Sequence, residues 1–252
     1  MAIMLRSMRI KLYVVHGSHP CATVEEALRI KRLDYKRVEL LPPLHAPLQR
    51  LRFGVRTVPG ITIDGEKLAG SIAILRRLEQ LAPDPSLFPA DPVERAMVEE
   101  AERWGEATFQ PIARRVLWPS LKRCPKAIAS FTEGARVRLP AAVLRLSVPL
   151  IAPIETAMNK ATDDALRADL RALPSQLDKI DAWIAEGVLG GEQPNAADLQ
   201  IASTIRLLYN VGDLRPLIEG RPAGELARRL FPSYPGDVPA GTLPAEWLPE
   251  AA

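Results

Sequence analysis

The sequence of 252 residues contains only two cysteines, Cys21 and Cys124. Two cysteines are too few for a disulfide-stabilised scaffold, and this scarcity is typical of proteins in a reducing, cytoplasmic compartment. Residues 1–9 hold only a short apolar patch together with two arginines, so we expect no signal peptide. These absences exclude the small secreted disulfide-rich class of protein.

Long hydrophobic runs are also scarce. The longest apolar stretch, residues 139–154, is interrupted by Pro140, Arg145, Pro149 and Pro153. It is shorter than the ~20 residues that a membrane-spanning helix needs. We therefore expect this stretch to be buried core and expect no membrane span.

Two further kinds of site lack support. No run of lysine and arginine is interleaved with aromatic residues, so we expect no nucleic-acid partner. His16, His19 and Cys21 do not form a dependable metal-ligand pattern, so we expect no metal. Hydrophobic residues make up 47% of the chain and charged residues 25%, as in globular proteins with a large core.

Charge is distributed unevenly along the chain. Through Ala82 there are 14 lysines and arginines against 7 acidic residues, whereas the remainder has 19 against 23. A basic first region favours the approach of an anionic substrate, although a solvated basic surface gives the same count.

The first 82 residues show alternating strand and helix signals. Residues 10–15 and 35–40 are typical of strands, and residues 21–31 between them have helical spacing. One or two helical turns are expected near residues 48–53. Asp64-Gly65 predicts a tight primed turn between strands at residues 61–63 and 66–68, and a helix follows over residues 71–81. This order predicts a β-α-β unit followed by a β-β-α unit.

The rest of the chain shows helix signals only. Pro83, Pro85 and Pro89 indicate a stiff linker, after which Asp91-Pro92-Val93-Glu94 is typical of a helix start. A later helix over residues 163–186 places six leucines and isoleucines on one face, with Pro174 expected to break or kink it. We expect the proline-rich last 20 residues to form an extended tail.

The pair Val58-Pro59 precedes the third predicted strand. A hydrophobic residue followed by proline at this point predicts a cis peptide bond that turns the N–H and C=O groups of Val58 outward. An extended peptide can then pair with Val58 as an additional strand. The alternative is an ordinary trans proline at the start of an edge strand.

Four motifs in order resemble the cytosolic glutathione transferase family. They are Ser18-His19-Pro20-Cys21 between strand and helix, Thr57-Val58-Pro59, Leu68-Ala69-Gly70-Ser71 at a helix start, and Pro194-Asn195-Ala196-Ala197-Asp198-Leu199. The resemblance implies a thioredoxin-like thiol-binding domain at residues 1–82, a linker at 83–91, an all-helical domain at 92–231 and a tail at 232–252. The fold class expected is thus α/β plus all-α. Within the fourth motif, Asn195 is expected to cap a core helix.

The resemblance also implies roles for particular residues. Ser18 would stabilise the thiolate of glutathione, which is the expected co-substrate, and Val58, Pro59 and Ser71 would bind its backbone and γ-glutamyl carboxylate. The family has an acidic residue before the serine, whereas this chain has Gly70. Arg56, or alternatively Arg50 or Arg52, would contact the glycyl carboxylate. For Ser18, simple helix capping is the competing interpretation.

Three functions remain open at this stage. The first is transfer of the glutathione thiol to a small-molecule electrophile, in detoxification, with Trp104, Arg103, Trp118 and alternatively Arg115 lining the electrophile pocket. The second is thiol–disulfide exchange or deglutathionylation by Cys21, which is otherwise a small buried residue. The third is a non-catalytic ligand- or protein-binding role. The resemblance further implies a homodimer that packs the third helix region against the fourth helix of its mate.

Overall fold

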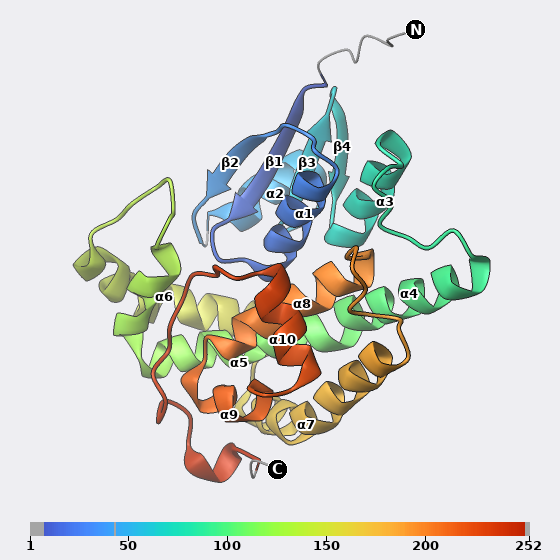
Figure 1. Ribbon diagram of the computed structural model, residues 1–252. Coiled ribbons are helices and arrows are strands. Elements are labelled where there is room, and N and C mark those ends of the chain that lie inside the picture. The colour runs from blue at the N-terminus through green and yellow to red at the C-terminus, as the bar shows by residue number, and fades with distance from the viewer. Residues whose placement is uncertain (1–7, 43, 250–252) are drawn as a thin grey trace, which may run out of the picture. The chain divides into compact units, whose positions relative to one another are not determined.

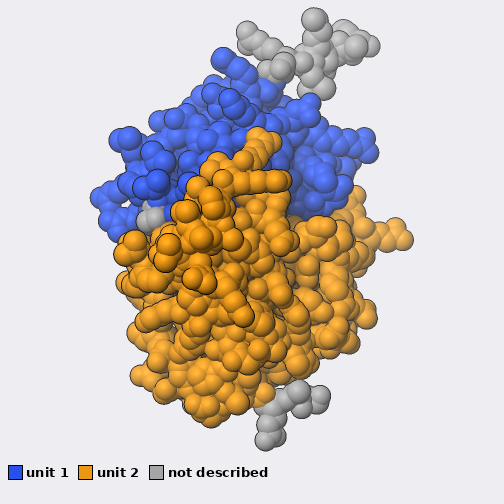
Figure 2. All heavy atoms as spheres, turned by 90° about the vertical axis from the view of Figure 1, so that its left-hand side faces the viewer, with its two compact units in different colours: residues 1–86 blue, residues 87–252 orange. Residues whose placement is uncertain are grey.

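The computed structural model describes residues 8–42 and 44–249, and the chain divides into two compact units. Residues 1–86 form the first unit and residues 87–252 the second, as the two colours in Figure 2 show. The expectations for residues 1–7, Pro43 and residues 250–252 lie outside the described residues. Each unit is described separately below.

The first unit is a four-stranded mixed sheet with three helices (Figure 1). The strand order is β2-β1-β3-β4, in which β1 and β2 are parallel and the other two pairs are antiparallel. The elements are β1 (Ile10–Val15), α1 (His19–Ile30), β2 (Lys36–Leu40), α2 (His45–Phe53), β3 (Gly60–Ile63), β4 (Glu66–Ala69) and α3 (Ser71–Leu81). The predicted βαβ-ββα order is confirmed, and the sheet is thioredoxin-like.

The β3–β4 hairpin follows from its turn residues. Asp64 and Gly65 both have positive φ angles, 49° and 98°, as a primed two-residue turn requires. Every residue of β3 is buried, so this strand lies at the centre of the first unit's core. The hairpin therefore holds the start of β3 and the end of β4 opposite each other, with Gly60 paired to Ala69.

Gly60 is required by the close approach of α2. A Cβ atom at this position would lie 2.7 Å from both Gln49 Oε1 and Phe53 Cε2. Only glycine avoids this overlap without displacing the helix. The contact fixes α2 against the strand that follows the Val58-Pro59 segment.

The second unit contains only helices as regular elements among its described residues. They are α4 (Pro92–Trp104), the π-helical η1 (Gly105–Phe109), α5 (Gln110–Arg123), η2 (Pro125–Thr132), α6 (Ala141–Met158), α7 (Asp163–Ala185), α8 (Ala196–Tyr209), η3 (Gly212–Leu214), α9 (Arg215–Ile218), α10 (Pro222–Leu230) and η4 (Ala245–Trp247). Residues 196–208 of α8 are all buried, so α8 is the core of this unit.

Helix starts in this unit match the local signals in the sequence. Asn195 accepts a hydrogen bond from the N–H of Asp198, and the Asp198 carboxylate accepts one from the N–H of Asn195. Asp91 likewise accepts from the first turn of α4. These contacts satisfy N–H groups that have no partner within the helix, and the cap predicted for Asn195 is confirmed.

Two expectations about helices are corrected by the structure. Pro174 does not break its helix, since α7 continues from Asp163 to Ala185 with its leucine face buried along its length. The stretch at residues 139–154 was expected to be buried core, but only 17% of the 18-residue window in α6 is buried. Of the described residues, α6 is the one helix long and apolar enough to cross a membrane by length and composition.

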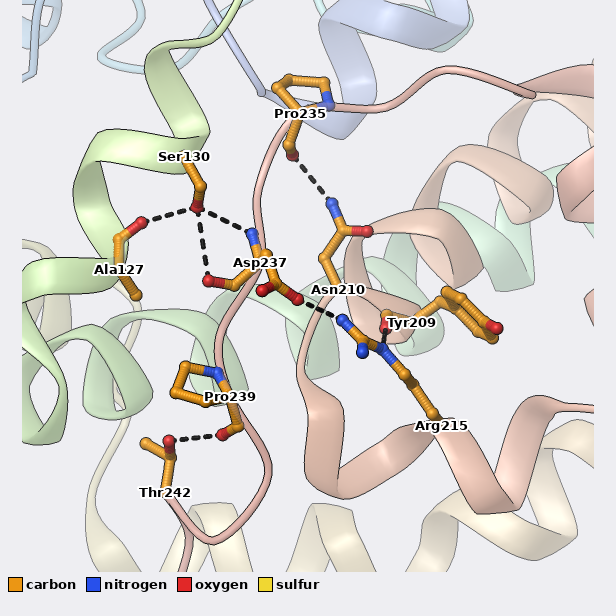
Figure 3. Close-up of polar contacts among 9 residues, drawn as sticks. All are labelled: Ala127, Ser130, Tyr209, Asn210, Arg215, Pro235, Asp237, Pro239 and Thr242. Carbon is orange, nitrogen blue, oxygen red and sulfur yellow. Dashed lines mark hydrogen bonds and ion pairs between the residues drawn. The ribbon is translucent and has the colours of Figure 1, made fainter.

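The tail after α10 is held by side chains from distant helices (Figure 3). Asn210 donates from Nδ2 to the carbonyl of Pro235, and Ser130 accepts from the N–H of Asp237. Asp213 accepts hydrogen bonds from the N–H groups of Gly241, Thr242 and Leu243. The tail is therefore an ordered part of the second unit.

Replacing Asp213 by alanine is expected to lower the free energy of unfolding by roughly 2–4 kcal/mol, because three N–H groups lose a charged acceptor. The matched control is Asp237→Ala. This change removes the ion pair between Asp237 and Arg215, in which the Asp237 side chain is 63% exposed. That change is expected to cost less than about 1 kcal/mol. Urea denaturation measures the free energy of unfolding of both variants. Equal losses of stability would contradict the role of Asp213 in holding the tail.

Candidate active site

Three loops meet at one end of the sheet in the first unit. β1 ends at Val15 and Tyr13 pairs with Gly60, so the residues after β1 lie at the end of the sheet where β3 begins. Gly60 also pairs with Ala69, and the N–H of Gly70 donates to the carbonyl of Pro59 at 3.0 Å. The register of the strands therefore brings the loops that carry Ser18, Val58-Pro59 and Gly70-Ser71 to the same end of the sheet.

Ser18 occupies the N-cap position of α1 without capping it. Its backbone is extended, with φ −78° and ψ 120°, and its carbonyl accepts from the N–H of Ala22 at 3.0 Å. Its side chain makes no capping hydrogen bond. Its hydroxyl contacts the thiol of Cys21 instead. The competing interpretation of Ser18 as a side-chain cap is therefore wrong.

Cys21 is a buried thiol and not an exposed nucleophile. It is 1% exposed, and burial raises its pKa to about 12 despite the hydrogen bond from Ser18, which favours the thiolate. A thiol with this pKa is almost entirely protonated near neutrality, and only the thiolate is nucleophilic. The prediction that Cys21 is a reactive residue is corrected on these grounds.

Val58 presents its main chain at the loop before β3. The Val58–Pro59 peptide bond is cis, as is Asp84–Pro85. Ladder pairing in β3 begins only at Gly60, and among the described residues the N–H and C=O groups of Val58 have no hydrogen-bond partner. Val58 is half-buried and Pro59 is buried. This leaves one donor and one acceptor for an extended peptide.

Gly70 and Ser71 form the start of α3. Gly70 has φ +87° and ψ 140°, a conformation that is essentially restricted to glycine. Ser71 is the first residue of the helix and is 2% exposed. The N–H groups of a helix's first turn have no intrahelical acceptor, so this start favours an anionic group. The geometry also explains why glycine is suited to this position.

The arginines considered for the glycyl carboxylate are exposed. Arg56 and Arg50 are both exposed on the loop and on α2. Arg52 stacks over the ring of Tyr13, with its guanidinium carbon 4.7 Å from the ring centroid. Arg52 is thereby committed to an aromatic contact, and Arg56 remains the arginine nearest in sequence to Val58.

The residues predicted for the electrophile pocket have different surroundings within the second unit. Trp104 stacks on Phe109 at 5.4 Å and meets Trp183 edge-on at 5.1 Å. Arg103 is exposed, and Trp118 is half-buried with no aromatic contact to Trp104 among the described residues. The contacts of Trp104 are those of a packing residue.

Arg115, the alternative residue for the electrophile pocket, forms an ion pair with Asp169. Its guanidinium donates two hydrogen bonds to the carboxylate of Asp169, at 2.5 Å and 2.8 Å. The neighbouring Arg114 is half-buried, and burial followed by repulsion from Arg115 lowers the pKa of its guanidinium. Arg114 was missed in the sequence because two adjacent arginines on a helix give no sign of which one is enclosed.

A second feature missed in the sequence is the polar side chain of Gln49. It is 1% exposed on α2, and both polar atoms of its amide are buried with no hydrogen-bond partner among the residues that the structure describes. It lies against Gly60, at the start of β3. A glutamine in a short proline-containing segment is usually exposed, so no sequence signal identified it. Among the described residues, no cluster of metal-ligand type was found.

Two buried carboxyl groups in the second unit have raised pKa values. Burial raises the pKa of Glu155 to about 7, and Glu155 Oε1 has no hydrogen-bond partner. Burial raises the pKa of Asp198 to about 6, although the N–H groups of Asn195 and Gly190 favour its charged form. Asp198 has a structural role as a cap, whereas in the described part of the chain no hydrogen bond to Oε1 offsets the burial of Glu155.

Replacing Glu155 by glutamine is expected to stabilise the protein at about pH 8 by roughly 1–3 kcal/mol. The pKa of Glu155 is raised in the fold, so its stabilising contribution is present below the unfolded pKa near 4.5 and is lost as pH rises toward about 7. The gain of the variant should therefore vanish near about pH 4.5. Urea denaturation across this range tests it, and a gain independent of pH would exclude Glu155 as the cause.

Comparison with known proteins identifies the family of the first unit. Residues 12–86 match the model of the glutathione S-transferase N-terminal domain. These residues of the first unit therefore form a domain similar to the N-terminal domain of glutathione S-transferases. The resemblance carried by the first three sequence motifs, which lie within residues 12–86, is confirmed. The thioredoxin-like sheet followed by helices is also the fold of solved glutathione transferase structures.

The matches to individual curated relatives cover only part of this chain. A probable maleylacetoacetate isomerase 1 from Drosophila melanogaster is 41% identical over 95 residues, covering 35% of this chain and 39% of that protein. The chain spans less than half of the length of the curated relatives it matches. Activity, substrates and partners of the whole chain are for that reason proposals.

Solved structures agree on the fold. A glutathione S-transferase from Rhodospirillum rubrum F11 is 21% identical with a TM-score of 0.59, covering 92% of this chain and 97% of that one. A maleylacetoacetate isomerase from Anaeromyxobacter dehalogenans 2CP-1, with glutathione bound in its active site, is 20% identical with a TM-score of 0.55 and covers 89% and 90%. At these identities the likeness shows the fold alone.

Proposed function

We propose that this protein is a glutathione-dependent enzyme in which Ser18 activates the thiol of glutathione for attack on an electrophilic carbon. The observation that carries the proposal is the state of the Ser18 hydroxyl. It stands at the start of α1 and does not cap that helix. It lies at the same sheet end as Val58, whose main-chain groups have no partner among the described residues.

The Ser18 hydroxyl is available to a thiolate because its present partner is weak. Cys21 is neutral near pH 7, since its pKa is raised to about 12, and a neutral thiol is a poor hydrogen-bond acceptor. A thiolate is a charged acceptor and forms a stronger hydrogen bond. Donation from Ser18 to a substrate sulfur, supported by the positive end of α1, lowers that sulfur's pKa below its usual value near ~8.5.

The remaining residues bind the glutathione backbone. The N–H and C=O groups of Val58 pair with its cysteinyl residue as an additional antiparallel strand. The hydroxyl of Ser71 and the first N–H groups of α3 hold the γ-glutamyl carboxylate. Gly70 supplies no acidic group for the γ-glutamyl ammonium, so we expect weaker binding than an acidic residue would give. Arg56 is placed to attract the glycyl carboxylate through its charge.

A second candidate is glutathione-dependent isomerisation, favoured by the 41% identity to a probable maleylacetoacetate isomerase. In such a reaction the sulfur adds to a carbon of an activated cis double bond, the remaining single bond rotates, and the carbon–sulfur bond breaks again. The thiolate is regenerated, so glutathione is not consumed. The same Ser18 contact serves both reactions because both begin with a stabilised thiolate.

Assembly and cellular role are proposed with this function. A homodimer is supported by α4, where Val93 is 70% exposed and Met97 is 40% exposed, since these apolar side chains suit contact with a mate. A cytoplasmic location agrees with two unpaired cysteines. A role in detoxification is proposed together with the transfer of the glutathione thiol to electrophiles. The division into a thiol-binding domain through residue 82, a linker and a helical domain remains a proposal beside the observed units.

Two assays with reduced glutathione test the proposed function. The first follows thioether formation with an aromatic halide, and the second follows conversion of maleylacetoacetate by its absorbance at constant glutathione. Turnover in the first supports transfer, and turnover in the second without loss of thiol supports isomerisation. Absence of both, in a protein whose melting temperature glutathione does not raise, would instead support a non-catalytic role.

A further inference from the structure

The outer face of α6 is apolar and uncovered by the rest of the second unit. Leu144, Val148, Ala152 and Glu155 form its buried face. Opposite them, Leu146 is 70% exposed, Leu150 is 73% exposed and Ile154 is 47% exposed. These three residues are four apart and therefore form one stripe along the helix. A helix that is apolar on all sides is normally buried, so this face indicates a missing partner.

The apolar surface extends beyond the helix. Val143 and Met158 are 48% and 39% exposed on α6, and Val137 and Leu139 are each 38% exposed in the loop before it. α6 lies at the left of the second unit in Figure 1, the side that faces the viewer in Figure 2. We use the name α6 face for these four residues together with Leu146, Leu150 and Ile154.

The exposed charges of the chain segment that carries the α6 face, residues 133–154, are predominantly basic, and Glu133 at its start is the one exposed acidic residue. Between Gly134 and Ile154 the chain has three arginines, Arg136, Arg138 and Arg145, and no acidic residue. All three arginines are exposed. Glu155, the next acidic residue along the chain, is 4% exposed and directed away from this face. The face is thus apolar with a basic border.

We propose that the α6 face docks onto an anionic lipid surface. Exposed leucines enter the boundary between headgroups and acyl chains, and arginines beside them attract the negative headgroups. A second copy of this chain fits less well. A symmetric contact would bring three arginines of each face against those of its copy, with Glu133 as the one exposed acidic residue of residues 133–154 to pair with them.

The contact is with the surface and does not cross the membrane. The inner face of α6 packs on the second unit through Leu144, Val148 and Ala152, so the helix cannot enter the bilayer alone while the unit is folded. Pro149 and Pro153, both inside α6 and exposed, each remove a helix hydrogen bond. Backbone groups without partners are tolerated at the wet interface and not in the hydrocarbon core.

Vesicle sedimentation with the full chain tests this proposal. We expect binding to phosphatidylcholine vesicles that contain phosphatidylserine, much weaker binding to pure phosphatidylcholine, and loss of binding as salt concentration rises. The double variant Leu146→Asn with Leu150→Asn should bind the anionic vesicles about tenfold more weakly or worse. Arg138→Gln with Arg145→Gln should weaken it by about tenfold as well.

The matched control is Leu51→Asn, because Leu51 is an 87% exposed leucine on α2 in the other unit. Its binding to anionic vesicles should equal that of the unaltered chain, and circular dichroism confirms that each variant is folded. Absence of binding to either vesicle type by the folded chain overturns the proposal. Concentration-dependent self-association that Leu146→Asn with Leu150→Asn abolishes, without vesicle binding, overturns it in favour of an interface between copies.

Discussion

Replacing Ser18 by alanine is expected to lower kcat/KM for the glutathione reaction by about 100-fold or more. Removing one hydrogen-bond donor that stabilises an anion in an active site typically lowers the rate by about 10²–10³-fold, which corresponds to about 2.7–4 kcal/mol. The hydroxyl of Ser18 has no capping role in α1, so its loss should leave the helix intact. Steady-state kinetics at saturating electrophile measure the effect. The pKa of bound glutathione, read from the pH dependence of the rate, should rise in the variant.

The control for Ser18 is Cys21→Ala, which distinguishes the two thiol mechanisms. Cys21 is 1% exposed with a pKa raised to about 12, so alanine should cost roughly 1–2 kcal/mol of stability and little activity. If Cys21→Ala abolished turnover while Ser18→Ala preserved it, the reaction would be thiol–disulfide exchange. That result would contradict the role given to Ser18.

Replacing Gly70 by glutamate is expected to move stability and glutathione affinity in opposite directions. The backbone of Gly70, with φ +87°, is costly for any residue with a Cβ atom, so stability should fall by about 1–3 kcal/mol. No atom lies within 4 Å of a Cβ placed there, so the side chain itself has room. A carboxylate beside the γ-glutamyl ammonium adds a charged hydrogen bond worth about 1.5–3 kcal/mol, which is at least about tenfold in affinity.

Gly70→Ala is the matched control because it carries the same backbone cost without the charge. Its loss of stability should equal that of the glutamate variant, with glutathione affinity unchanged. Denaturation curves of the two variants measure the backbone cost at residue 70, and glutathione titrations measure the effect of the added carboxylate. Equal affinity of Gly70→Glu and Gly70→Ala would show that the γ-glutamyl ammonium is not bound beside residue 70.

Local signals in the sequence predicted the elements that are fixed by neighbouring residues. The helix expected over residues 71–81 is observed as Ser71–Leu81, because its apolar spacing and the preceding glycine both lie within the segment. The Asp64-Gly65 turn was predicted for the same reason, whereas the cap at Asn195 was predicted from the family resemblance. The order of strands followed from these elements and from the family resemblance.

Features that depend on tertiary contacts were not predictable from the sequence. Composition does not tell whether an apolar helix is covered, and the outer face of α6 is exposed where buried core was expected. Trp104 contacts Phe109 and Trp183, and the second of these is far along the chain. The burial of Cys21 likewise depends on the packing of α1 within the first unit, so its pKa required the structure.

The central claim is that the sheet end carrying Ser18, Val58 and Ser71 binds glutathione. Isothermal titration calorimetry of the unaltered chain with reduced glutathione tests it most directly. The account predicts saturable heat at one site per chain, with weak affinity that Gly70→Glu strengthens. A flat titration at millimolar glutathione, for the unaltered chain and for Gly70→Glu alike, would contradict the account.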